Sequence, residues 1–313
     1  MFTSSAQSQS SGEYYLDVYQ KDPSTNNNQE IQFAIAYGHF KGSGSAVPQY
    51  ASVGFSPSRA VYKQYANTLL NAGDEQFTVT SVHPSSSANL EQFYAVNFQR
   101  TRMKEKIDPG NWELHVSGNT TPIKLIDDST VSDGTVTEAG RQYFIRSGTI
   151  DAGLFSGDTY HYGVVYPDMG VLILDTAAID GQVGLTVDSS SYAYSSTAVT
   201  VSNANTTHFF HHLSGSSTAQ VGYFAARNKE TIHSTHYFVR VKNNEFNFSN
   251  NPTFTSGSAG TFANASFFRD PKSYITTIGM YNDNNELLAV AKLSKPLLKT
   301  FSREALVRVK LEF

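Results

Sequence analysis

The chain has 313 residues, of which 39% are hydrophobic and 13% aromatic, while only 16% are charged. This length can hold one large β unit or two domains of about 150 residues, and it is long enough to bury a sizeable core. The net charge of −4 gives no global field that favours nucleic acid or an anionic membrane as a partner, and the absence of cysteine excludes disulfides, thiolate metal sites and cysteine nucleophiles.

The first twelve residues are mostly small and polar, and they predict a flexible N-terminal arm over residues 1–12. They lack the basic and apolar regions of a secretory signal. The strongest apolar run, residues 171–174, is far shorter than the roughly 20 residues that a membrane helix needs. We therefore expect a protein that is used where it is made or assembled, without a membrane partner.

Short runs of β-branched and aromatic residues, bounded by Gly, Pro, Asn and Asp, dominate the rest of the chain. This pattern predicts a mainly β fold of sandwich-like antiparallel sheets with a few short helices. The expected strands are 32–40, 77–82, 93–100, 112–116, 142–146, 221–226, 236–241, 274–281, 287–293 and 305–313.

Two turn-forming clusters each separate two good strands, and they predict hairpins around 167–170 and 282–285. The chain has no clear linker. We expect a β-rich part at 13–180 and a second β-rich part at 181–313, although the same pattern is compatible with a single domain.

Helix signals are few. Ser56 followed by Pro57 predicts a helix start, and the spacing of Val61, Tyr65 and Leu69 gives that helix one apolar face. The segment 71–73 would end it. A second short helix is expected at about 203–213.

The sharpest cluster of potential metal ligands is His208, His211 and His212. On a helix, His208 and His212 are four residues apart and could share one metal ion. The cluster lacks the Glu of the zinc-protease helix motif, so packing or a polar interface is the preferred interpretation and no metal is predicted.

Other catalytic patterns are weak. Asp127 and Asp128 are a carboxylate pair, but adjacent residues in a strand point to opposite faces, which favours a structural loop pair. The sequence contains no phosphate-binding glycine loop and no serine in a tight nucleophile elbow. We predict no catalytic residue and no cofactor, and therefore no enzyme.

The combination of many Tyr and Phe residues with few charges is typical of the centres of protein–protein interfaces, although buried β cores use the same residues. The basic run 100–106 is interrupted by Glu105, so a protein interface is preferred there over nucleic acid. Predicted interface residues lie in the arm, the basic run and a later loop: Phe2, Arg100, Arg102, Lys104, Lys106, Asn243, Asn244, Phe246, Phe248 and Phe254.

Three stretches of the C-terminal third, 236–254, 268–283 and 286–293, resemble virion structural proteins of contractile-tailed bacteriophages, of the myovirus kind that infects cyanobacteria and other marine bacteria. The segments 98–112 and 162–170 fit the same group, so the resemblance spans most of the chain. These are strand and turn residues that indicate a family without giving a mechanism.

The resemblance implies a virion subunit in the phage tail, expected to be a component of the baseplate wedge and made in the host cytoplasm. Its expected partners are other phage structural proteins and copies of itself. Alternatives of the same class are a neck, head-to-tail connector or capsid-associated protein. A receptor-binding or glycan-binding tail fibre module is a further alternative, which would stack exposed Tyr and Trp side chains on sugars; Trp112 lies in a predicted strand and is expected in the core. An enzyme, such as a cell-wall hydrolase carried by the tail, ranks third.

Overall fold

The structure is a computed structural model that describes residues 1–3, 14–45, 56–118, 122–183, 204–214 and 222–312. It divides into two compact units, Met1–Glu230 and Thr231–Phe313. The sequence suggested a boundary near Asp180, but the structure has it after Glu230. The strand β12 (Tyr223–Lys229) pairs with β5 (Lys106–Val116) and therefore belongs to the sheet of the first unit.

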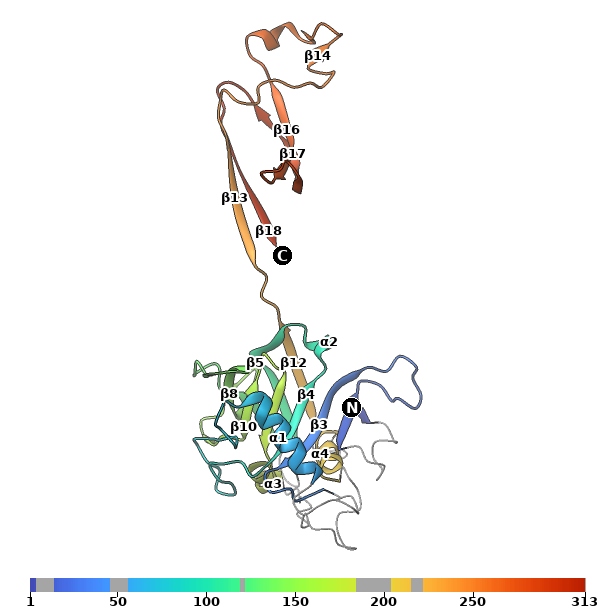
Figure 1. Cartoon of the computed structure of the whole chain (residues 1–313), viewed down its shortest axis with the longest axis vertical. Helices are drawn as coiled ribbons and strands as arrows, with labels where there is room; N and C mark the ends of the chain where they lie inside the picture. Colours follow the sequence, from blue (N-terminus) through green and yellow to red (C-terminus); the bar gives the residue numbers. More distant parts are fainter. Residues whose placement is uncertain (4–13, 46–55, 119–121, 184–203, 215–221, 313) are drawn as a thin grey trace. The chain divides into compact units, whose positions relative to one another are not determined.

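The first unit is built on one antiparallel sheet (Figure 1), which confirms the mainly β prediction. Its path through the described residues is β1-β2-β3-β4-β11-β10-β8-β6-β5-β12, and β7 and β9 each pair with β8. The remaining bounds are β1 Phe2–Thr3, β2 Tyr15–Tyr19, β3 Ile31–His39, β4 Gln92–Phe98, β6 Ile123–Asp127, β7 Thr135–Thr137, β8 Gly140–Thr149, β9 Gly153–Leu154, β10 Gly163–Tyr166 and β11 Val171–Asp175.

This sheet is curled, so that strands far apart in its order come together. The ring of Phe224 in β12 lies 5.1 Å from that of Phe33 in β3 and 5.1 Å from that of Phe98 in β4. The two ends of the sheet therefore approach each other and enclose the larger of two apolar clusters.

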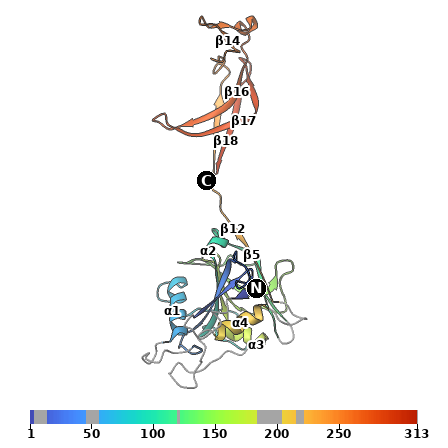
Figure 2. The ribbon, with the colours of Figure 1, turned by 90° about the vertical axis from the view of Figure 1, so that its right-hand side faces the viewer.

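Helices cover both sides of the curled sheet. The helix α1 (Pro57–Leu69) packs over one apolar cluster, and α3 (Thr176–Val183) and α4 (Ala204–Ser214) pack against the other. Figure 2 shows α1 on a different side of the strands from α3 and α4. A short fourth helix, α2 (Arg100–Met103), occupies the basic run.

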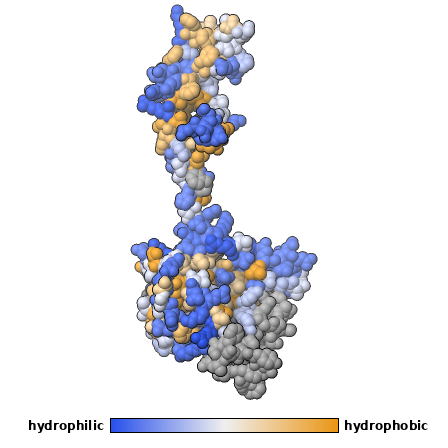
Figure 3. Space-filling model, in the orientation of Figure 1, coloured by the Kyte–Doolittle hydropathy of each residue, from blue (hydrophilic) through white to orange (hydrophobic). Residues whose placement is uncertain are grey.

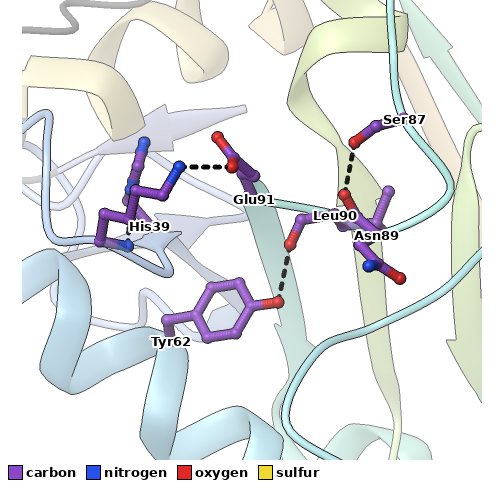
Figure 4. Close-up of polar contacts among 7 residues, drawn as sticks. His39, Tyr62, Ser87, Asn89, Leu90 and Glu91 are labelled. Carbon is purple, nitrogen blue, oxygen red and sulfur yellow. Dashed lines mark hydrogen bonds and ion pairs between the residues drawn. The ribbon is translucent and has the colours of Figure 1, made fainter.

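The helix α1 begins where the sequence predicted, after Ser56 and with Pro57 at its start. Its buried face differs from the expected one: Tyr62, Ala66 and Leu69 are buried, whereas Val61 and Tyr65 are only partly buried. Tyr62 explains the shift, because its hydroxyl donates a 2.7 Å hydrogen bond to the carbonyl oxygen of Leu90, just before β4 (Figure 4). That bond turns the Tyr62 side of the helix toward the sheet.

The predicted hairpin around 167–170 is present as β10 and β11, with Tyr166 opposite Val171 and Gly170 at φ 70. The expected strand at 77–82 is wrong. That segment makes only the isolated bridges Thr78–Asn89 and Val82–His161. Its Phe77 and Val79 are buried against α1 and the sheet, so their apolar character serves packing without regular pairing.

The second unit consists of two-stranded antiparallel ribbons. β13 (Ser234–Val241) pairs with β18 (Ala305–Glu312), and β16 (Ser273–Tyr281) pairs with β17 (Leu287–Lys299), which confirms the hairpin around 282–285. A small tip carries β14 (Thr255–Ser256), β15 (Thr261–Phe262) and the 3-10 helix η1 (Ala265–Phe268). Within the described residues, neither long ribbon is joined to a third strand.

The two units differ sharply in their cores. Among the described residues, the first unit has 39 buried hydrophobic residues against 8 large hydrophobic residues that are exposed. The second unit has only 4 buried, namely Val241, Phe254, Ala305 and Val309, against 14 exposed. Since isolated two-stranded ribbons are at best marginally stable in water, the second unit resembles an element that needs a neighbour to cover it.

Candidate interaction surface

The loop that connects β13 to the tip is organised by a buried lysine. Lys299 is completely inaccessible, and its Nζ donates to the carbonyl oxygen of Asn243 at 2.8 Å, to Asn247 Oδ1 at 3.1 Å and to the carbonyl oxygen of Thr300 at 3.1 Å. A buried ammonium group is costly unless its protons are accepted. Here three oxygens accept them, and the loop is held in one conformation as a result.

A second bond fixes the same loop, because Ser273 Oγ donates to the carbonyl oxygen of Phe246 at 2.6 Å. Phe246 has φ 53, a left-handed conformation that is uncommon for a bulky residue. Its side chain is 72% exposed. The backbone is therefore held on the inside while the aromatic ring is presented to solvent.

Four phenylalanines form a small aromatic cluster in the tip. Phe254 is buried at its centre, and its ring contacts those of Phe248, Phe262 and Phe267 at 5.0 to 5.8 Å. Phe246 and Phe268 lie outside these ring pairs and are 72% and 80% exposed, and Phe248 is 59% exposed. We call Phe246, Phe248 and Phe268 the aromatic tip.

Exposed apolar side chains also lie along both ribbons. On β16 and β17, the ring of Tyr281 lies over Gly279 and beside Leu287, and the nearby Val290 is exposed too. On the other ribbon, Phe238 and Leu306 are exposed among the basic residues Arg240 and Arg308. Figure 3 shows the apolar character of this unit on the face in view. Such a density of exposed apolar side chains is typical of an interaction surface.

The predicted interface residues fall on three separate places. Asn243, Asn244, Phe246, Phe248 and Phe254 all belong to the second unit, where Phe254 is buried within the tip and the other four are exposed or partly exposed. Phe2 is exposed and lies in β1, which pairs with β2, so this part of the expected flexible arm is held in the sheet. The rest of the expected arm, residues 4–12, lies outside the described residues.

The basic run lies on α2 and the start of β5, and its charges meet acidic groups of the first unit. Arg102 pairs with Glu30, Lys104 with Glu230 at 3.3 Å and Lys106 with Asp168 at 3.8 Å. Arg100 donates to the carbonyl oxygen of Asp168 at 3.1 Å. These neutralising contacts reduce the positive field that phosphate recognition would require.

Arg102 also borders a cavity of about 590 Å³ at the open edge of the curled sheet. Its walls come from β2, β3, β4, α2, β5 and β12, and include the aromatic rings of Phe33, Phe98 and Phe224. The charged residues of the wall are Arg102 and Arg227. The rest of the lining consists of aromatic, aliphatic and amide side chains, and no residue of the lining forms a nucleophile and base pair.

The three histidines of the predicted cluster lie in different environments. His208 and His211 are exposed on α4, while His212 Nδ1 donates to the carbonyl oxygen of Ser117 at 2.7 Å. Ser117 N and Oγ in turn donate to the carbonyl oxygen of His212 at 2.9 and 2.7 Å. Among the described residues, no group of three His, Asp or Glu side chains has the arrangement that a metal ion needs.

Asp127 and Asp128 organise the loop after β6, as the sequence interpretation favoured. Both carboxylate oxygens of the buried Asp127 accept from Gly110 N, at 3.0 and 2.8 Å, and Oδ1 also accepts from Ser129 N. Asp128 Oδ1 accepts from Phe144 N at 3.0 Å. Burial raises the pKa of Asp128. The two carboxyl groups are thus used to join neighbouring backbone segments.

A second carboxyl pair, which the sequence analysis missed, lies at the end of β11 and in α3. Asp175 accepts from Ser86 Oγ and from Ala177 N, and burial raises its pKa. Burial and the neighbouring Asp175 raise the pKa of Asp180 to about 8. Asp180 Oδ1 is buried and has no hydrogen-bond partner among the described residues, and Asp175 is only 1% exposed, which keeps substrate away from the pair.

Comparisons with models of protein families, with characterised proteins and with solved structures find no match to this chain. Within the part of the chain that the structure describes, no helix has the length and apolar character required to cross a membrane.

Trp112 is completely buried in the first unit, which confirms that it is a core residue.

Sequence reasoning found Phe246 and Phe248 of the aromatic tip but missed Lys299, which holds their loop. Lysine is usually a surface residue, so Lys299 carried no signal that it would be buried. Phe268, Tyr281 and Leu287 were assigned to ordinary strands and turns, because an alternating pattern cannot show that both faces of a ribbon remain uncovered.

Proposed function

We propose that the chain is a non-enzymatic structural subunit of a bacteriophage virion, located in the tail as a component of the baseplate wedge. The observation that carries this proposal is the second unit, with 14 exposed large hydrophobic residues against 4 buried among those described. A subunit held by interfaces needs aromatic anchors and apolar area more than it needs an enclosed site. The resemblance of the sequence to myovirus structural proteins supplies the virion context.

The placement of polar groups is compatible with this role. The basic run is occupied by intramolecular contacts to Glu30, Glu230 and Asp168, and the carboxylates of Asp127 accept backbone bonds. These groups stabilise loops of the first unit. The proposed partners are therefore other structural proteins and copies of this chain, bound through the second unit.

A neck, connector or capsid position would use the same surfaces, and the experiment must separate these positions. Phage particles and isolated tails are purified on density gradients, and the chain is quantified by mass spectrometry with a known baseplate protein as the reference. The proposal predicts a fixed ratio to that reference in both preparations. Presence in whole particles but absence from isolated tails contradicts the tail assignment, and absence from both contradicts the virion role.

A glycan-binding fibre module is the second candidate, because Tyr274 and Tyr281 are each more than 60% exposed and could stack on sugar rings. Binding to host-surface polysaccharide that is lost in the double variant Tyr274→Ala and Tyr281→Ala would favour this function. The variant Tyr223→Ala, at an exposed tyrosine of the first unit, is the matched control.

A further inference from the structure

The two units carry opposite net charges. Thr231–Phe313 contains 10 basic and 6 acidic residues, for a net charge of +4, whereas Met1–Glu230 contains 13 basic and 21 acidic residues, for a net charge of −8. Two copies that meet through like units repel each other, and two copies that meet through unlike units attract. Long-range electrostatics thus favours a head-to-tail encounter between chains.

The first unit offers an apolar groove beside α1. It has a volume of about 670 Å³ and no charged residue in its walls. The lining comes from α1, β2, β3 and β4 and from the residue before β2: Tyr14, Tyr15, Ala34, Ala36, Pro57, Ala60, Val61, Gln64, Tyr65 and Asn97. A cavity of roughly 150 Å³ accommodates a benzene ring, so this groove can hold several aromatic side chains.

The aromatic tip has the matching chemistry. Phe246 projects from a loop held by Ser273 and Lys299. Phe268 ends the 3-10 helix η1, which is capped by Asn264. Neither ring takes part in the tip's own aromatic cluster. Aromatic pairs gain about 0.5–1.5 kcal/mol beyond their buried area, and the groove presents three tyrosines to such rings. Rigid presentation lowers the entropy lost on binding.

We propose that the aromatic tip of one chain docks into the α1 groove of a second copy of the same chain. The contact is heterologous, since each copy uses its tip toward one neighbour and its groove toward another, so repetition produces a ring or an open filament. The apolar contact supplies affinity, and the opposite net charges of the two units set the orientation of approach. This self-association does not depend on the proposed role in a virion.

The test uses two full-length variants that each remove one side of the contact. The double variant F246S/F268S alters the tip, and A60W fills the groove from an exposed position on α1. The variant N67W, at an exposed position of α1 outside the groove lining, is the matched control for A60W. Circular dichroism checks that all variants keep the strand content of the wild type.

Analytical ultracentrifugation at 1–100 μM measures the association. We expect the wild type and N67W to form species larger than dimers, and each of the other two variants alone to associate at least tenfold more weakly. An equimolar mixture of F246S/F268S and A60W should form dimers and nothing larger, because only one intact tip and groove pair remains. The proposal is overturned if the wild type stays monomeric, if A60W assembles like the wild type, or if the mixture stays monomeric.

Discussion

Lys299 Nζ donates a 2.8 Å hydrogen bond to the carbonyl oxygen of Asn243, across 56 positions of sequence. This bond joins the end of β17 to the loop that carries Phe246 and Phe248 of the aromatic tip. A buried cation thus acts as a structural brace, because three oxygens surround it in a unit that has very little apolar core.

Removal of this brace should loosen the tip loop. In Lys299→Met, the acceptor oxygens of Asn243 and Thr300 lose their donor, and unsatisfied buried acceptors cost about 1–3 kcal/mol. We expect faster amide hydrogen exchange over residues 243–254, measured by mass spectrometry. Lys295→Met, at an exposed lysine of the same strand, should leave exchange unchanged. Equal protection in both variants would show that Lys299 does not hold the loop.

Asp180 should make the first unit less stable as the pH rises. Its folded pKa of about 8 lies above the value of roughly 3.9 in an unfolded chain. The carboxyl group therefore favours the folded state fully below pH 4, and that contribution is lost progressively between pH 4 and pH 8 as the unfolded state releases its proton first.

Asp180→Asn removes this titration. With allowance for partial solvent access, we expect the free energy of unfolding of the variant to exceed that of the wild type by about 2 kcal/mol at pH 8. Near pH 4 the two free energies of unfolding should be equal. Urea unfolding at both pH values measures the difference. Asp151→Asn, at an exposed aspartate, serves as the control. A gain that is the same at pH 4 and pH 8 would rule out titration of Asp180 as the cause.

Gly163 has a conformation that only glycine tolerates, with φ 143 and a position where a Cβ would lie 2.0 Å from the carbonyl oxygen of Ile173. The clash is with the backbone of the neighbouring strand, so it cannot be relieved by a rotamer change. Gly163→Ala should lower the free energy of unfolding of the first unit by about 3 kcal/mol. Gly157→Ala, which meets open space, should change it by less than about 0.5 kcal/mol in the same urea titration.

The two units should unfold in separate transitions. The chain has a single tryptophan, and Trp112 is buried in the first unit, so its fluorescence reports that unit alone. Circular dichroism reports the strands of both. We expect circular dichroism to change at lower urea than fluorescence, because the second unit has the smaller core. Coincident curves would contradict independent units.

The sequence predicted the parts of the fold that local chemistry dictates. The hairpin turns at 167–170 and 282–285 and the start of α1 follow from turn and cap residues, and all three are present. The helix α3 was missed because Thr176–Val183 has little apolar periodicity and depends on packing against the sheet. The apolar run at 77–82 was predicted as a strand but makes only isolated bridges. Phe77 and Val79 are buried without regular strand pairing, and the sequence pattern of such a segment is the same as that of a strand.

The candidate site was predictable in composition but not in geometry. Phe246 and Phe248 could be recognised from an aromatic loop with few charges. The unit boundary at Glu230 depends on the long-range pairing of β12 with β5, which no local pattern shows. Burial of Lys299 depends on three oxygens that meet only in the folded unit.

The decisive measurement is a cryo-electron microscopy map of the intact phage particle with this chain located in it. We predict density in the baseplate, with Phe246, Phe268 and Tyr281 of the second unit buried against neighbouring chains. A chain found in the baseplate with these side chains facing solvent would contradict the role of the second unit as the interface. Density at the neck or capsid would contradict the wedge assignment, and absence of the chain from the particle would contradict the virion role itself.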